Sequence, residues 1–195
     1  MSHLEPPELE KKLGIELYAT KSLGIGGKIR QTPEDFIVEE VLTNGLIAQV
    51  SPTFLQKPSG SGRYLICLLV KRNWDTLLAV KRIAKQLHIK ASRIGIAGIK
   101  DTRAVTAQHV SIQNITPEEV SKARFKDLTL HPICFSNEEI SSRVLLGNRF
   151  CITIREIQHS KSVVERRIRH VEEDILLMGG LPNFYGHQRL SLIHI

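Results

Sequence analysis

The chain has 195 residues, enough for one domain with a good core or for one domain with a small appendage. It is 42% hydrophobic and 24% charged, as soluble globular proteins are, and no stretch approaches the roughly 20 consecutive apolar residues of a membrane span. Residues 1–20 hold two lysines against four glutamates, a net of −2, so the rest of this chain of net charge +7 carries +9. That excess favours nucleic acid or another polyanion as the partner.

The first 25 residues are predicted to form an acidic extension before the main fold. They lack the basic start and the apolar run of a signal peptide, so we expect a cytoplasmic protein. Residues 36–41 and 63–72 are predicted to be strands, and the second is a continuous apolar run suited to a central strand. Residues 75–89 are predicted to form an amphipathic helix with an aspartate as its N-cap.

The second half of the chain also alternates strands and helices. Residues 93–96 are predicted to be a short buried strand. Further strands are predicted at residues 104–112, 128–135 and 150–157. Two more helices are predicted, one that starts after Thr116 and one over residues 160–178. Because this alternation lacks the regular rhythm of βαβ units, we predict an α+β fold with a mixed, mostly antiparallel sheet and flanking helices.

The most informative segment is residues 97–108, which places a lysine and an aspartate side by side between two predicted strands. Lys100 and Arg103 flank Asp101, and nearby cations favour the charged form of a carboxyl group. An anionic aspartate in a basic setting suits nucleophilic or base chemistry on a polyanionic substrate. An ordinary polar turn is the alternative that this segment alone leaves open.

Four separated segments carry more polar chemistry than a fold needs. They are residues 30–40, which include Pro-Glu-Asp-Phe-Ile-Val, residues 98–108, residues 147–152, which include Asn-Arg-Phe, and residues 182–189, which read Pro-Asn-Phe-Tyr-Gly-His-Gln-Arg. In this order and spacing they resemble the tRNA pseudouridine synthase D family. The Ala-Gly-x-Lys-Asp-x-x-Ala-x-Thr-x-Gln motif at residues 97–108 is the most specific of them, and the resemblance runs from about residue 14 to Arg189.

The resemblance implies a pseudouridine-synthase-like catalytic domain and isomerisation of a specific uridine in tRNA, expected at the thirteenth nucleotide in the D arm. It assigns Asp101 as the catalytic carboxylate and Arg30 as its basic partner. An arginine fork can hold a carboxylate in one orientation. The resemblance assigns Phe150, Asn148 and Lys100 to substrate binding, with Phe150 stacking on the target base. It implies tRNA as the partner and no metal or organic cofactor.

The sequence departs from the family pattern after Arg189, where Leu190 and Ser191 replace an expected phenylalanine and glycine. We therefore expect a truncated chain with residues 1–25 as an N-terminal extension, residues 26–190 as a partial catalytic domain, and residues 191–195 as a tail that does not match the family. A catalytic domain that lacks strands would expose sheet edges, so we expect this chain alone to be inactive.

Two other functions stay open at this point. The first is a non-catalytic RNA-binding module that keeps the basic surface but performs no chemistry. The second is a different nucleic-acid enzyme, such as a glycosidase-like base remover, which would also use an aspartate, a cation and a stacking aromatic. Intact Asp101, Arg30 and Phe150 favour catalysis over binding alone. The absence of a second obvious acid that could activate water argues against hydrolysis.

Overall fold

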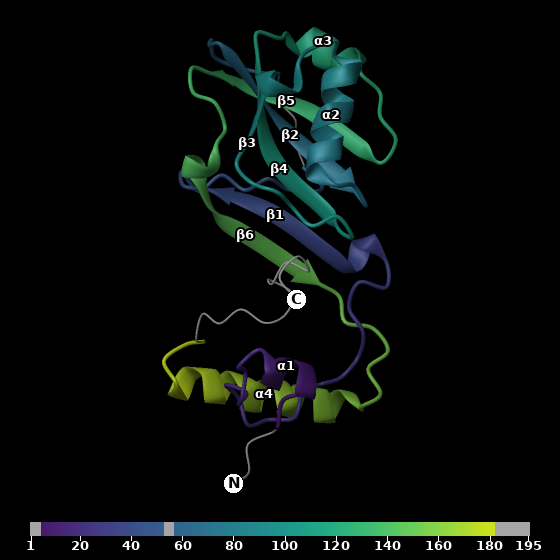
Figure 1. The fold of residues 1–195 in the computed structure, drawn as a ribbon, viewed down its shortest axis with the longest axis vertical. Coiled ribbons are helices and arrows are strands. Elements are labelled where there is room, and N and C mark those ends of the chain that lie inside the picture. The colour runs from purple at the N-terminus through teal and green to yellow at the C-terminus, as the bar shows by residue number, and fades with distance from the viewer. Residues whose placement is uncertain (1–4, 53–56, 182–195) are drawn as a thin grey trace. The chain divides into compact units, whose positions relative to one another are not determined.

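The computed structural model describes residues 5–52 and 57–181 (Figure 1). The chain divides into two compact units. One unit is Lys28–Arg155, and the other joins residues 5–27 to residues 156–181. The domain boundaries expected after residues 25 and 190 stay a prediction.

A single mixed sheet dominates the unit Lys28–Arg155 (Figure 1). Its strands are β1 (Phe36–Leu42), β2 (Tyr64–Arg72), β3 (Ile94–Ile96), β4 (Val105–Gln113), β5 (Leu128–Ser136) and β6 (Leu145–Ile152). The strand order is β5-β2-β4-β1-β6, and β3 pairs with the end of β4. The β1–β4 pair is parallel, whereas the other pairs are antiparallel. This arrangement confirms the predicted α+β fold with a mixed, mostly antiparallel sheet.

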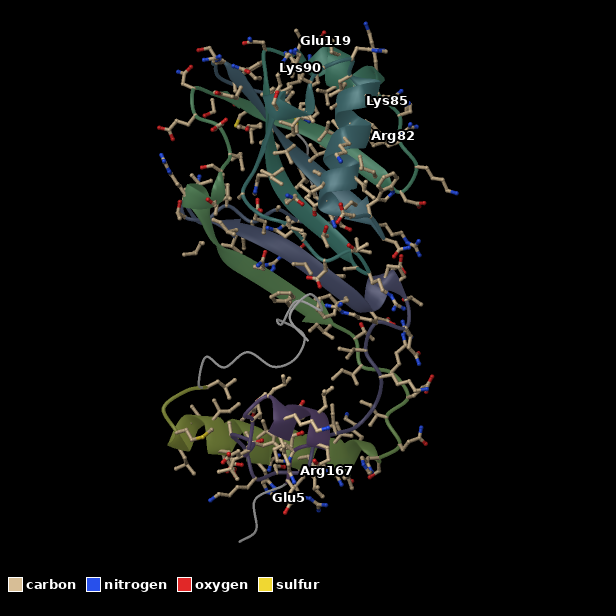
Figure 2. All side chains as sticks on the ribbon, viewed as in Figure 1. Glu5, Arg82, Lys85, Lys90, Glu119 and Arg167 are labelled. Atoms are coloured by element: carbon tan, nitrogen blue, oxygen red, sulfur yellow. The ribbon has the colours of Figure 1, made fainter. Side chains whose placement is uncertain are left out.

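Helix α2 (Thr76–Gln86) covers one face of this sheet (Figure 1). The Asp75 carboxylate caps the helix by accepting a hydrogen bond of 2.9 Å from the backbone N–H of Leu78. The apolar side of the helix packs on β2 and β4 in the main core, while Arg82 and Lys85 lie on its exposed side (Figure 2). The helix predicted over residues 75–89 is therefore confirmed, with its end three residues earlier.

Shorter elements complete the unit. Helix α3 (Pro117–Lys122) begins with the capping box of Thr116 and Glu119 that the sequence predicts. Three single-turn 3₁₀ helices lie at Pro33–Asp35, Ala91–Arg93 and Ser142–Val144. The turn at Pro33–Asp35 directly precedes β1, and the turn at Ala91–Arg93 directly precedes β3.

The second unit consists of α1 (Glu8–Lys12), an extended segment and α4 (Lys161–Leu177). The backbone N–H of Lys21 donates to Asp174 on α4, and Arg167 on α4 donates to the carbonyl of Gly24. Gly179, with φ +74°, follows the last turn of α4, as the predicted helix over residues 160–178 requires. Within the described ranges no helix is long and apolar enough to cross a bilayer.

One strand lies elsewhere than predicted. The sequence predicts a strand at residues 150–157, but β6 runs from Leu145 to Ile152. It pairs with β1 along its whole length, from Phe36 opposite Ile152 to Leu42 opposite Leu145. The Gly-Asn-Arg stretch resembles a turn by composition. Among the described residues, however, β6 is the last strand of the sheet, and edge strands tolerate such polar residues.

Candidate active site

The segment between β3 and β4 carries Asp101 and is fixed by hydrogen bonds on both sides. The hydroxyl of Thr76, at the first position of α2, accepts from the backbone N–H of Lys100 at 3.0 Å and donates to its carbonyl at 3.3 Å. Farther along, the carbonyl of Ala104 accepts a 2.9 Å bond from the backbone N–H of Asn73. The start of α2 and the end of β2 therefore hold the loop that presents Asp101.

The structure brings Arg30 and Asp101 together across 71 positions of sequence. Arg30 Nη2 donates to Asp101 Oδ1 at 2.7 Å, and both side chains stay partly accessible, at 29% and 35% exposure. Arg30 has a φ of +58°, in the left-handed region that non-glycine residues rarely occupy. Such backbone conformations collect at functional sites, where the surrounding structure enforces them.

Two aromatic rings extend this pair to the surface of the sheet. The Arg30 guanidinium carbon lies 3.7 Å from the centroid of the Phe36 ring, in cation–π geometry. The Phe36 ring meets Phe150 edge to face, with centroids 5.9 Å apart and planes at 67°. Phe36 is buried, whereas Phe150 is 51% exposed. A partly exposed aromatic face therefore lies one ring away from the cation that binds Asp101.

The other two predicted site residues lie in different settings. Asn148 is exposed and comes two residues before Phe150 on β6, so both side chains leave the same face of the sheet. Lys100 is buried, and its ammonium binds Glu40 Oε2 at 2.7 Å. Arg103, the other flanking cation of the motif, is exposed.

Glu40 is the centre of a buried polar cluster beneath the loop. Besides Lys100, it accepts a 2.9 Å hydrogen bond from the backbone N–H of His109 on β4. Burial acts to raise the pKa of the Glu40 carboxyl, but the hydrogen bonds from His109 and Lys100 outweigh burial and lower it. The buried carboxylate of Glu40 therefore fixes Lys100, the residue that directly precedes Asp101.

The acidic residues around β1 are paired with basic side chains from elsewhere in the unit. Glu34 binds Arg72 on β2, and Asp35 binds Arg155 at 2.7 Å. Glu39 binds Arg149, its cross-strand neighbour on β6. The Arg72 and Arg155 partners lower the pKa values of Glu34 and Asp35, respectively. The Pro-Glu-Asp-Phe segment therefore tethers β1 to its surroundings besides supplying Phe36 to the site.

The two glycines near the loop differ in the space around them. Gly98 is not among the residues with positive φ, and a Cβ there would meet Leu145 Cδ2 at 3.4 Å, which is ordinary contact. Gly95 on β3 has no such room, because a Cβ would lie 2.6 Å from the carbonyl oxygen of Ile140. The close approach that requires glycine is therefore at β3 rather than at Gly98.

A groove of about 810 Å³ is lined by both apolar and polar residues, mainly from β2, β5 and the segment that follows β1. None of the five predicted site residues lies in its wall. Across residues 5–52 and 57–181, no cluster of three or more His, Cys, Asp or Glu side chains is arranged to hold a metal ion.

The motif at residues 182–189 and the departure after Arg189 lie outside the described residues. Phe36 belongs to a quoted motif but received no role there, although it contacts Arg30. Among the described residues, two further contacts of the loop were not predicted, namely Glu40, which binds Lys100, and Lys71, which donates to the carbonyl of Asp101. The available signal was a charged residue at a buried strand position. Lys71 ends the apolar run of β2, and Glu40 interrupts the apolar alternation of β1. A buried charge of this kind is rare unless it is paired, and it points to a site.

Comparison with known proteins identifies relatives of the chain. Residues 12–193 match the family model described as tRNA pseudouridine synthase D. A curated relative from Methanosarcina barkeri, named "Probable tRNA pseudouridine synthase D", is 38% identical over 97% of this chain. A relative of the same name from Thermococcus onnurineus is 38% identical over 89% of it.

A solved structure agrees with these sequence matches. A crystal structure of a Methanosarcina mazei protein, named "Putative tRNA pseudouridine synthase D (TruD)", covers 95% of this chain with a TM-score of 0.83 and 38% identity. The chain spans 41% of the Methanosarcina barkeri relative and 40% of the crystallised protein. The similarity therefore extends over nearly all of this chain but less than half of each of these two proteins.

Proposed function

The chain belongs to the tRNA pseudouridine synthase D family, and from that membership we propose that it carries the catalytic aspartate of an enzyme that converts a uridine of tRNA to pseudouridine. The observation that carries the proposal is the Arg30–Asp101 pair with Phe150 beside it. The expected target is the thirteenth nucleotide, in the D arm. The proposed setting is the cytoplasm, and the proposed partner is tRNA.

The proposed reaction needs a carboxylate held at one end of an open site. The bond between C1′ of the ribose and N1 of uracil breaks, the uracil turns, and C1′ bonds to C5. C5 then loses its proton and N1 gains one, so the product is an isomer of the substrate. Asp101 acts either as the nucleophile at C1′ or as the base that takes the C5 proton. Arg30 orients one carboxylate oxygen and leaves the other available, since only Oδ1 lies in the 2.7 Å bond.

Phe150 supplies the stacking surface. A uridine inside folded tRNA must leave its stack to reach Asp101, and an aromatic face restores about 1–3 kcal/mol of that stacking. Its half-exposed ring beside Phe36 suits this role, and Asn148 on the same face of β6 is proposed to contact the flipped nucleotide. A substrate-binding role for Lys100 stays a prediction, and in this structure its ammonium binds Glu40.

The test is an Asp101→Asn variant of the full natural protein, assayed on unmodified tRNA with a pseudouridine-specific chemical readout. The amide keeps the size of the side chain but removes the charge, so pseudouridine formation should vanish while the tRNA dissociation constant changes by less than about threefold. Asp127→Asn is the matched control, because Asp127 is exposed and its φ of +56° suits asparagine. Wild-type levels of pseudouridine in the Asp101 variant would exclude this assignment.

The same experiment separates the two alternatives. A non-catalytic RNA-binding module would bind tRNA and yield no pseudouridine with either the wild type or the variant. A base-removing enzyme would release free uracil and leave an abasic site, which strand cleavage by aniline detects. The partly exposed pair of Arg30 and Asp101 supports chemistry over binding alone, because a surface that only binds RNA does not need a carboxylate held by an arginine.

A further inference from the structure

Lys71 is an unusual residue for the end of a central strand. It is fully buried on β2, the strand that lies between β4 and β5 in the sheet. Its ammonium donates to the carbonyl oxygens of Trp74 at 2.7 Å, Asp101 at 2.8 Å and Lys100 at 3.4 Å. A lysine ammonium has three N–H donors, so the three carbonyls match its full donor capacity.

The partners of Lys71 are backbone groups rather than a counter-ion. Among the described residues, no carboxylate lies within ion-pair distance of its Nζ, although Asp75 and Asp101 act on it electrostatically. A buried charge without an ionic partner is costly, so a neutral side chain would be expected here if packing were the only requirement. The contacts instead converge on the two residues at the catalytic position, Lys100 and Asp101.

We propose that Lys71 is a positioning residue for the reaction, which acts by fixing the backbone of the loop that carries Asp101. Its three hydrogen bonds tie β2, which carries Lys71, to the carbonyls of Trp74 before α2, of Lys100 and of Asp101 itself. Thr76 holds the backbone of Lys100 from the other direction. With these anchors the Asp101 side chain leaves a rigid backbone and meets Arg30 in one geometry. The inference rests on the proposed role of Asp101.

Because Lys71 is buried, its hydrogen bonds to the loop should depend on pH. Burial lowers the pKa of Lys71 to about 8, with Asp75 and Asp101 acting in the opposite direction and Lys100 adding to the decrease. As pH rises through this value the ammonium loses a proton, and the neutral amine has two donors for three carbonyls. The loop then loses one of its anchors, and the rate should fall.

The test compares Lys71→Met with Lys85→Met in the full natural protein. Methionine keeps most of the apolar stem of Lys71, and Lys85 is an exposed lysine of α2 (Figure 2). For Lys71→Met we expect a single-turnover rate on tRNA reduced about tenfold or more, since small displacements of reacting groups cost that much. KM should stay within about threefold, and amide hydrogen exchange should accelerate in residues 97–104 but not in β5. Lys85→Met should match the wild type in the single-turnover rate and in exchange.

Two further outcomes keep the inference separable from the function. If the wild type forms no pseudouridine, the proposed function fails. The rate of amide hydrogen exchange in residues 97–104 then still tests whether Lys71 fixes the loop. If Lys71→Met does not fold, the wild-type rate between pH 7 and 9 decides, because it should decline around the Lys71 pKa of about 8. The proposal would be overturned if Lys71→Met matched Lys85→Met in amide hydrogen exchange and in single-turnover rate. A wild-type rate that does not change between pH 7 and 9 would also overturn it.

Discussion

Arg30 lies over the ring of Phe36, with its guanidinium carbon 3.7 Å from the ring centroid, while the same guanidinium binds Asp101. Phe36 is the first residue of β1 and is buried, so its position is set by the core. A planar guanidinium that stacks on a fixed ring has little freedom to turn. The orientation of the proposed catalytic carboxylate is therefore determined by the first residue of a strand.

Changes at Arg30 should separate charge from geometry. Arg30→Ala removes both, and we expect the single-turnover rate to fall by about 100-fold. Arg30→Lys keeps a positive charge without the fork, so it should retain more activity. Both variants share the left-handed backbone at this position, so strain cancels from the comparison. Equal loss in both variants would show that geometry rather than charge matters, and wild-type rates in both would show that the pair has no role.

Phe36→Leu tests the aromatic support of Arg30. Leucine is smaller than phenylalanine, so the unfolding free energy should fall by about 0.5–3 kcal/mol, as for an ordinary core substitution. The rate should also fall, because the guanidinium loses the ring on which it stacks. Phe125→Leu is the control, as Phe125 packs against the main core around α2. Chemical denaturation and single-turnover assays on both variants check the prediction, which fails if the two rates are the same.

Phe150→Ala should weaken the enzyme without weakening the fold. The ring is 51% exposed, so its removal should change the melting temperature little. Loss of a stacking face worth about 1–3 kcal/mol should lower kcat/KM by roughly 5- to 150-fold. Ile152→Ala, two residues along the same face of β6 and also exposed, is the matched control. Steady-state kinetics on tRNA measure both, and similar losses in the two variants would argue against base stacking.

Glu40→Gln should destabilise the protein in a pH-dependent way. The amide leaves the buried Lys100 ammonium unpaired, which costs about 3–5 kcal/mol at neutral pH. Because the folded-state pKa of Glu40 is lowered, the wild type holds this stabilisation above the unfolded pKa and loses it as pH falls through the folded value. Urea unfolding at pH 7 and near pH 4 should show the difference between wild type and variant shrinking. Glu34→Gln, which breaks an exposed and solvent-screened pair with Arg72, should cost much less.

The 195-residue chain and a chimera that continues it with the remaining sequence of the Methanosarcina mazei protein should differ in activity. This chain covers 40% of that protein. In the described residues β6 pairs with β1 alone and leaves Phe150 and Ile152 exposed. We expect the chimera to form pseudouridine and the chain alone to bind RNA in a strongly salt-dependent way without turnover. Equal turnover would show that Asp101, Arg30 and Phe150 need no further strands.

Local signals in the sequence predicted much of this fold. The caps Asp75 and Thr116 predicted helix starts to the residue, because a side-chain acceptor satisfies the free N–H groups of the first turn. The apolar run of β2 predicted a central strand. The position of β6 was wrong because its pairing depends on β1, more than a hundred residues earlier in the chain, and not on its own composition.

The candidate site was also predictable only in part from the sequence. The motif predicted Asp101 and its pairing with Arg30, and the structure brings those two side chains into contact. The ring of Phe36 and the ammonium of Lys71 could not be placed from sequence, since each acts through contacts between segments that are far apart in the chain. The burial of Lys100 and its pair with Glu40 also depend on a distant segment, and its predicted role in substrate binding stays a prediction.

The chain enters and leaves the sheet unit at one place. Lys28 and Arg155 exchange two backbone hydrogen bonds of 2.8 Å, and the Asp35 carbonyl accepts from Thr153 beside them. The two ends of this segment are therefore neighbours, as in a domain inserted into a surface loop of a host. Adjacent ends of this kind are the geometry that excision with a short linker, or circular permutation at a different loop, requires.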